Sequence, residues 1–190
     1  LNPLSPYAAA KAGADRLVYS YMHTYGIPAV IVRPFNNYGP CQHIEKAIPN
    51  FIVSALQNEP VTIHGQGLSS RDWTFVSDTC EGVDKILHAD FDTVKGQTIN
   101  LGSEEDVNVL DIARMILKIM DKPESLLNYT EDRPGQVSRH IACAKKARKL
   151  LGWEATTKLE EGLEKTVEFY TNNPKWWERY LWMKELWEKN

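Results

Sequence analysis

The sequence feature that most restricts the fold is a continuous apolar run, Ala29-Val30-Ile31-Val32, between two helix-like segments. A run without polar residues at every second position is typical of a parallel strand that is covered on both faces. The flanking residues 5–25 and 44–58 carry apolar side chains at helical spacing. Because parallel strands are joined through crossover helices, this order predicts an α/β fold.

The rest of the sequence continues this alternation. We expect further strands at residues 61–64, 73–76, 98–101 and 128–130. Further helices are expected from Ser77 or Asp78 to about Ala89, from Asn108 to Met120, and at residues 144–151, 159–171 and 174–189. Residues 34–40 are expected to form a loop. No segment is rich enough in Gly, Ser or Pro to separate domains, so residues 1–190 are expected to belong to one unit.

Composition and charge narrow the classes of function. The chain has 190 residues, of which 43% are hydrophobic, and its formal net charge is −3. This balance is typical of a globular protein and argues against a nucleic-acid partner. The apolar runs are too short to cross a bilayer and no signal peptide is visible, so we expect a cytoplasmic protein without a membrane partner.

Cysteine and histidine spacing gives no sign of a disulfide frame or a metal site. The three cysteines lack a CxxC pair, which favours reduced thiols, and the five histidines lack the spacing of metal ligands. The chain begins at Leu1, without an initiator methionine, and leads at once into a helix. We therefore expect it to be part of a larger protein with an upstream portion.

The first expected helix places a phenol and an amine one turn apart. Ser5 can cap this helix and Pro6 suits its first turn, so Tyr7 and Lys11 share one face. A free phenol titrates near 10, and acting as a base near neutral pH requires its pKa to fall by about three units, worth about 4 kcal/mol. A neighbouring ammonium and a cationic cofactor could supply this shift. A chance pair on an amphipathic helix has the same spacing.

Residues 33–40, Arg-Pro-Phe-Asn-Asn-Tyr-Gly-Pro, follow the carboxyl end of the first strand. Open α/β sheets bind ligands at this position. Pro34 and Pro40 stiffen the loop, Gly39 permits close backbone approach, and the amides of Asn36 and Asn37 can hydrogen-bond a polar ligand. A plain strand-to-helix connection is the alternative.

Two arginines in expected turns add a second indication of a ligand. Arg71 and Arg133 each stand beside an aspartate, and a planar guanidinium can bind two phosphate oxygens at once. Most arginines in loops are only solvated, so either one alone indicates little. Together with Tyr7 and Lys11 they favour a phosphate-bearing ligand.

A glycine-rich dinucleotide loop is missing from the sequence. The nearest match, Gly65-Gln66-Gly67, follows a strand, but Ser70 replaces the third glycine and no helix is expected to begin there. We interpret the segment as a turn and expect this chain alone to bind NAD weakly. The tryptophans of the C-terminal residues 176–187 are interpreted as packing residues.

These ordered motifs resemble the extended short-chain dehydrogenase/reductase family, and within it the nucleotide-sugar epimerases and dehydratases. Ser5-Pro6-Tyr7 with Lys11 is similar to the family's YxxxK site. Several further segments resemble the dehydratase branch of the family. They are residues 36–40, Gln42, Glu45-Lys46, Ile48-Pro49, Arg71-Asp72-Trp73, residues 132–135, Glu161-Gly162-Leu163 and Thr166-Val167. The likeness runs almost end to end, but it covers only the part of the family downstream of its catalytic tyrosine.

The resemblance implies a fold and a set of roles. The chain would hold the last elements of a Rossmann-like fold and the small nucleotide-sugar-binding subdomain, without the N-terminal NAD-binding half. Tyr7 would remove the proton of the sugar 4-hydroxyl while a hydride passes to NAD, and Lys11 would hold the nicotinamide ribose and lower the pKa of the phenol. Pro34 and Asn36 would lie near the nicotinamide. The substrate, a dTDP- or UDP-sugar, would be bound by Asn36, Asn37, Lys46, Arg71, Asn100 and Arg133.

The same resemblance leaves questions open. Gln136-Val137 stands where the dehydratases usually have His-Asp, so the preference for base and sugar is undecided. The glycine-rich loop, the Ser/Thr partner of the tyrosine and the Asp-Glu pair for water elimination belong upstream. We expect the full-length parent to be an NAD-dependent nucleotide-sugar 4,6-dehydratase and a homodimer, and this chain alone to be inactive. A nucleotide-sugar 4-epimerase and a non-catalytic nucleotide-sugar-binding module are the alternatives.

Overall fold

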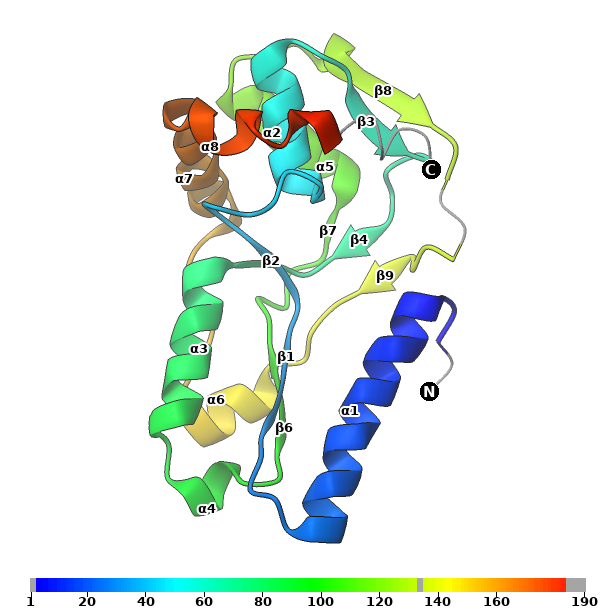
Figure 1. Ribbon diagram of the computed structural model, residues 1–190. Coiled ribbons are helices and arrows are strands. Elements are labelled where there is room, and N and C mark those ends of the chain that lie inside the picture. The colour runs from blue at the N-terminus through cyan, green and yellow to red at the C-terminus, as the bar shows by residue number, and fades with distance from the viewer. Residues whose placement is uncertain (1–2, 133–134, 184–190) are drawn as a thin grey trace.

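The computed structural model describes residues 3–132 and 135–183 and has the predicted α/β architecture (Figure 1). Its helices are α1 (Pro6–Tyr25), α2 (Ala47–Gln57), α3 (Val76–His88), α4 (Phe91–Val94), α5 (Val109–Ile119), α6 (Lys145–Leu151), α7 (Leu159–Asn172) and α8 (Pro174–Glu178), with 3-10 turns at Glu124–Leu126 and Leu181–Met183. Its strands are β1 (Ile31–Pro34), β2 (Asn36–Tyr38), β3 (Val61–His64), β4 (Ser70–Arg71), β5 (Trp73–Phe75), β6 (Thr98–Leu101), β7 (Val107–Asn108), β8 (Leu127–Thr130) and β9 (Arg139–His140).

The strands form small sheets that are mostly parallel. β1 pairs with β6, β2 with β5 and β3 with β8, each in parallel, while β4 lies antiparallel to β7 and parallel to β9. In Figure 1, β1 and β6 lie in the lower half with α3, α4 and α6, and β3 and β8 lie in the upper half with α2, α5, α7 and α8. β2 lies at the junction of the two halves.

Each half has its own hydrophobic core. In the upper half, Ile52 of α2, Ile112 of α5 and Leu163 of α7 are fully buried in one cluster. In the lower half, Leu101 of β6 packs in a second cluster with Trp153, which is also fully buried. The parallel sheets therefore belong to two separately packed halves that meet at β2.

The predicted caps of α1 and α5 are confirmed. The Ser5 hydroxyl accepts a hydrogen bond from the Ala8 amide at 3.2 Å and begins α1, and Gly26 ends that helix in a left-handed conformation, with φ at +65°. At α5 the Asn108 side chain accepts from the Asp111 amide at 2.8 Å. These helix ends follow from local chemistry.

Other predicted boundaries are wrong. Residues 34–40 are not all loop, because Asn36–Tyr38 pairs with β5 as β2. α2 begins at Ala47 rather than 44, after turns that leave Ile44 buried in the upper core. α3 begins at Val76, and Asp78 does not cap it, because its carboxylate accepts bonds from the amide and hydroxyl of Thr157, both at 3.1 Å.

The expected C-terminal helix is shorter than predicted. α8 ends at Glu178, and the Tyr180 amide donates to the Trp177 carbonyl at 2.9 Å, which tightens the chain into a 3-10 turn. The part of the prediction that falls on residues 184–189 lies outside the described residues. The packing role expected for the tryptophans is confirmed for Trp177, which is buried in the upper core, and is wrong for Trp182, which is 64% exposed.

The first strand is less covered than predicted. Ile31 is buried, but Val32 is half-buried and Arg33 is exposed. The reason is that, among the described strands, β1 pairs only with β6 and keeps an open edge.

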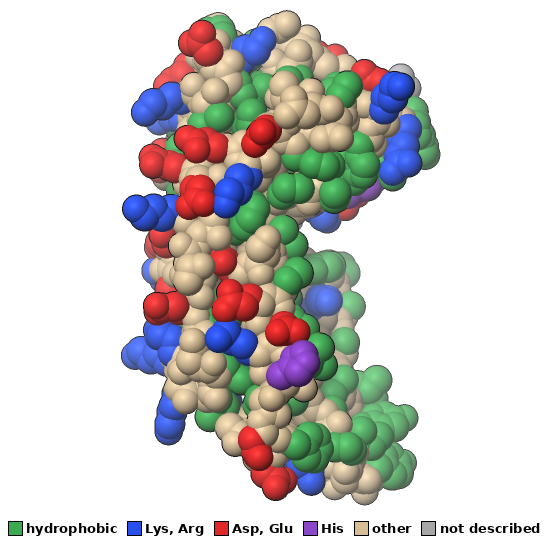
Figure 2. Space-filling model, turned by 90° about the vertical axis from the view of Figure 1, so that its left-hand side faces the viewer, with side chains coloured by type: hydrophobic (Ala, Val, Ile, Leu, Met, Phe, Trp, Pro, Cys, Tyr) green, Lys and Arg blue, Asp and Glu red, His purple; other side chains and the backbone are tan. Residues whose placement is uncertain are grey.

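α1 leaves most of its apolar side chains in solvent. Met22 is buried, whereas Leu17 is 59% exposed and Val18 and Tyr21 are also exposed. In Figure 1, α1 lies along one edge of the molecule, and Figure 2 shows hydrophobic side chains gathered on the lower half, below a hollow that separates it from the upper half. Within the described ranges, neither α1 nor any other helix is long and apolar enough to traverse a bilayer.

A buried carboxylate ties the segments of the junction together. Asp72 is fully buried and accepts hydrogen bonds from the amide and hydroxyl of Ser103 at 2.8 and 2.9 Å. It also accepts from the Glu104 amide at 2.9 Å, the Ala142 amide at 3.1 Å and the Thr74 hydroxyl at 3.0 Å. The end of β6 and the segment after β9 are thus fixed to one side chain.

Replacing Asp72 by Asn is expected to lower the free energy of unfolding by about 3 kcal/mol or more, because hydrogen bonds to a charged group contribute about 1.5–3 kcal/mol each. The amide keeps one acceptor oxygen and turns an NH₂ group toward other donors. Urea unfolding measures the difference. The matched variant Asp84→Asn changes an exposed carboxylate and should have little effect. Equal stability of the two variants would contradict the role of Asp72.

Candidate functional site

The carboxyl end of β1 leads directly into the first predicted ligand residues. Pro34 ends β1, and the Phe35 amide donates to the Leu101 carbonyl at 2.9 Å. The backbone and side-chain nitrogens of Asn36 both donate to the Asp72 carbonyl, at 3.2 and 3.1 Å. The Asn36 side chain is thereby fixed, and its oxygen is left as a hydrogen-bond acceptor.

Asn37 is held from two sides at the next position. Its side-chain oxygen accepts from the Thr79 hydroxyl at 2.7 Å, and its carbonyl accepts from the Gln42 side chain, also at 2.7 Å. Among the described residues its side-chain nitrogen has no partner, so it remains a donor for a ligand. Lys46 lies farther along the same loop and pairs with Glu45 at 2.7 Å on the surface. Such exposed pairs are weak and exchange readily for another anion.

Arg71 is half-buried beside an aromatic pair. β4 and β9 bring Arg71 level with His140, whose ring stacks on Phe35 with centroids 4.7 Å apart. The Arg71 guanidinium donates to the carbonyl of the preceding residue, Ser70, at 2.7 Å, and within the described part of the chain no carboxylate lies at ion-pair distance. Burial lowers the pKa of Arg71. A partly desolvated cation without a counter-ion suits an anionic ligand.

The start of α1 touches the turn that follows Arg133. A Cβ atom added to Gly135 would lie 3.2 Å from the Leu4 carbonyl oxygen and 3.9 Å from Cβ of Ser5. Tyr7 follows within two residues and is 74% exposed. Two motifs that lie about 130 residues apart in the sequence therefore meet in space. Arg133 itself lies outside the described residues.

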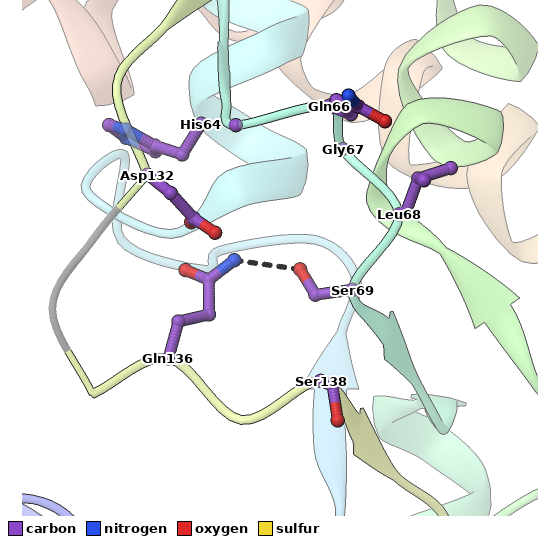
Figure 3. Close-up of a pocket in the computed structure, with 9 residues that line it drawn as sticks. His64, Gln66, Gly67, Leu68, Ser69, Asp132, Gln136 and Ser138 are labelled. Atoms are coloured by element: carbon purple, nitrogen blue, oxygen red, sulfur yellow. Dashed lines mark hydrogen bonds between the residues drawn. The ribbon is translucent and has the colours of Figure 1, made fainter.

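A pocket of about 430 Å³ lies between the turn after β3 and the segment before β9 (Figure 3). The Gln136 side chain donates to the Ser69 hydroxyl at 2.7 Å and joins the two walls. Asp132 and Gln136 point toward one another in Figure 3. The pocket is lined by His64, Gly65, Gln66, Gly67, Leu68, Ser69, Asp132, Gln136 and Ser138.

The interpretation of residues 65–67 as a turn is confirmed. Gly65 and Gly67 have φ angles of +59° and +69°, and a strand, β4, follows them instead of a helix. The turn forms one wall of the pocket, a position that sequence reasoning did not predict. Its pocket volume falls in the range of small-molecule sites.

The structure brings some of the predicted residues together and separates others. Asn36 and Arg71 are joined through Asp72, and Leu4 and Ser5, which precede Tyr7, lie next to Gly135. Asn100 stands apart on β6, where its side chain donates to the Cys143 carbonyl at 3.5 Å. Among the described residues, no hydrogen bond or ion pair joins the Asn100 side chain to Arg71.

Sequence reasoning missed three polar residues of this region, His64, Gln136 and His140. Gln136 was noted only as a departure from the dehydratase pattern. His140 sits in a two-residue strand, and His64 ends a predicted one. Their partners are distant in the sequence, so no local pattern marked them.

Known proteins match this chain over most of its length. The family model described as GDP-mannose 4,6 dehydratase matches residues 1–166. The trifunctional UDP-glucose 4,6-dehydratase of Arabidopsis thaliana is 40% identical over 178 residues, which is 93% of this chain and 26% of that protein. The dTDP-glucose 4,6-dehydratase of Neisseria meningitidis is 35% identical over 190 residues, covering 94% of this chain and 53% of that protein.

Solved structures share the fold. The dTDP-glucose 4,6-dehydratase of Bacillus anthracis in complex with NAD has a TM-score of 0.88 at 33% identity, covering 94% of this chain and 56% of that one. The UDP-glucuronic acid 4-epimerase of Bacillus cereus has a TM-score of 0.85 at 33% identity, covering 90% of this chain and 54% of that one. The Rossmann-like α/β class is confirmed, and the chain spans about half the length of these proteins.

Replacing Arg71 by Met is expected to raise the pKa of His140. Burial lowers that pKa from its ordinary value, and the nearby guanidinium lowers it further, so removing the charge should partly restore it. NMR titration of the imidazole measures the change. Arg139→Met is the matched control, because Arg139 is adjacent in sequence but pairs with Asp106 at 2.6 Å. An unchanged pKa in Arg71→Met would mean that the guanidinium does not face the imidazole.

Proposed function

Because the chain belongs to the GDP-mannose 4,6-dehydratase family, we propose that it forms the substrate-binding part of an NAD-dependent nucleotide-sugar 4,6-dehydratase. The observation that carries this proposal is the contact between Gly135 and the residues before Tyr7. This contact supports the proposal because Leu4 and Ser5 lead directly into the helix of Tyr7 and Lys11. The dTDP-glucose and UDP-glucose dehydratases among its relatives favour a dTDP- or UDP-sugar as the substrate.

The nucleotide would occupy the pocket of Figure 3 and contact Arg71 beside it. Asp132, Gln136 and Ser69 offer acceptors and donors for the edge of a base. Arg71 lies two residues beyond Ser69, and together with Arg133 it would bind the diphosphate. Asn37 and Lys46 would then contact the remaining polar groups of the nucleotide sugar. A role for Asn100 has less support, because its side chain is engaged with Cys143.

The residues present fit the nicotinamide side of NAD. Tyr7 and Lys11 are exposed one turn apart on α1. The side-chain oxygen of Asn36, two residues after Pro34, has no partner among the described residues and can accept a hydrogen bond. The turn at residues 65–67 opens no helix, so it gives no dinucleotide loop. When bound, NAD would accept the hydride of the sugar C4 and return it later in the turnover.

The side chains of this chain would perform the first proton transfer. Tyr7 would take the proton of the sugar 4-hydroxyl, and the Lys11 ammonium would stabilise the phenolate by its charge. The arginines would hold the diphosphate so that the sugar hydroxyl stays next to the phenol. In a 4,6-dehydratase the proton then leaves C5 and the hydroxyl leaves C6 as water. We place no residue of this chain in that step.

A 4-epimerase is the second candidate, because the UDP-glucuronic acid 4-epimerase of Bacillus cereus shares the fold. Incubating the full-length gene product that contains this chain with dTDP-glucose and UDP-glucose separates the two. A 4-keto-6-deoxy product supports the dehydratase, and a C4 epimer alone would contradict it. A non-catalytic binding module would bind these nucleotides in calorimetry and convert neither. That the full-length parent is cytoplasmic and forms a homodimer stays a prediction.

Tyr7→Phe in that gene product is expected to reduce kcat by at least about a thousandfold, because the ring is kept while the proton acceptor is lost. The Kd for the nucleotide sugar should change by less than about twofold, since the phenol contributes little to ground-state binding. Turnover and calorimetry provide the two measurements. Tyr25→Phe, at the far end of α1, is the control. Near-normal turnover in Tyr7→Phe would exclude the proposed base.

Arg133→Ala is expected to weaken nucleotide-sugar binding by about 2–3 kcal/mol, the contribution of a charge-assisted hydrogen bond. Calorimetry with dTDP-glucose and UDP-glucose measures this loss. Arg139→Ala removes an arginine of the same segment that already pairs with Asp106 and should leave affinity unchanged. Equal affinity in both variants would remove Arg133 from the diphosphate site.

A further inference from the structure

An aromatic cluster closes the C-terminal end of the described chain. Phe169 and Tyr170 at the end of α7 meet Trp176 edge to face, with centroids 5.7 and 5.9 Å apart, and Trp176 meets Tyr180 at 5.8 Å. In Figure 1 this C-terminal segment passes in front of α2. The cluster contacts Gln42 and His43 of residues 40–46, the loop that carries Lys46.

Two contacts attach the cluster to that loop. The Tyr170 hydroxyl donates to the Gln42 carbonyl, and the rings of His43 and Tyr180 lie 5.0 Å apart. Tyr170 is fully buried, and burial raises the pKa of its hydroxyl, which therefore stays a donor. The Trp177 indole donates to the Tyr170 carbonyl at 2.8 Å and fixes the end of α7.

The loop in turn holds Asn37. The Gln42 side-chain nitrogen donates to the Asn37 carbonyl at 2.7 Å, while its side-chain oxygen is buried without a partner among the described residues. The Asn37 carbonyl thus sets the orientation of the Gln42 side-chain amide, because the reverse orientation would place the Gln42 oxygen against the Asn37 oxygen. Cys41, next to Gln42, has φ at +64°, a left-handed conformation that is unfavourable for a residue with a side chain. The loop needs external support to keep this shape.

We propose that Tyr170 and Gln42 are positioning residues, through which the C-terminal aromatic cluster keeps Asn37 and Lys46 in place for the nucleotide sugar. This inference rests on the proposed function, since it requires that the loop contacts that ligand. Neither side chain need touch the substrate. Tyr170 acts through the Gln42 carbonyl, and Gln42 acts through the Asn37 carbonyl.

The test removes the two links separately in the full-length gene product. Tyr170→Phe deletes one hydroxyl and keeps the buried ring, and Gln42→Ala deletes the bond to Asn37 on the loop itself without touching the core. Tyr129→Phe, on the exposed face of β8, is the matched control. Calorimetry with dTDP-glucose and UDP-glucose gives the affinity, and turnover gives kcat.

Hydrogen exchange supplies a readout of the loop itself. The Gln42 and Lys46 amides donate to the Gly39 and His43 carbonyls, so their exchange reports loop opening, with the amides of α5 as the internal reference. Both variants should weaken nucleotide-sugar binding about fivefold, as expected for one lost hydrogen bond. They should also speed loop exchange relative to α5 and leave kcat within about twofold.

Unchanged affinity in Tyr170→Phe, while the unaltered protein binds the ligand, would overturn this inference and leave the proposed function standing. A loss of affinity in Gln42→Ala but not in Tyr170→Phe would also overturn it, because the cluster would then not support the loop. Failure of the unaltered protein to bind either nucleotide sugar would defeat the proposed function and this inference together. That failure is visible without any variant.

Discussion

The buried Asp72 carboxylate is the interaction on which the arrangement of the site depends. A carboxylate away from water is strongly unfavourable unless its oxygens accept hydrogen bonds, and here backbone amides and hydroxyls supply them. Its own carbonyl fixes Asn36, and the next residue toward the N-terminus is Arg71. Gly102 has no room for a side chain, because a Cβ would lie 2.6 Å from the Asp72 carboxylate. One charge therefore sets the spacing of several proposed ligand contacts.

The site forms where the two packed halves of the chain meet. The upper half contributes the pocket wall at residues 65–69, and the lower half contributes the end of β1. The segment 135–140 runs between them, touching the start of α1 through Gly135 and pairing with β4 through His140. A ligand that spans this junction would contact both halves. The residues proposed to bind it are therefore widely spaced in the sequence.

Local chemistry made part of this structure predictable. The caps of α1 and α5, the strands β3, β6 and β8, and the shared face of Tyr7 and Lys11 depend on neighbours within a few positions. Predictions failed where a distant partner decides. Asp78 reads as a helix cap but binds Thr157, 79 residues away, and β2 exists only because β5 pairs with it. Asp72 and His140 owe their importance to such long-range contacts.

α1 is attached to the remainder of the fold by few contacts. Asp15 pairs with the exposed Arg33 of β1 at 2.6 Å, Met22 is the only buried residue of the helix, and Gly135 touches the segment that precedes it. Arg71, in contrast, lies on β4, which is paired with β7 on one side and with β9 on the other. The proposed base thus stands on a helix with one buried residue, and the proposed anion contact stands on a strand that is paired on both sides. A surface that covered the exposed Leu17 and Tyr21 would hold α1, and with it Tyr7, more firmly in place.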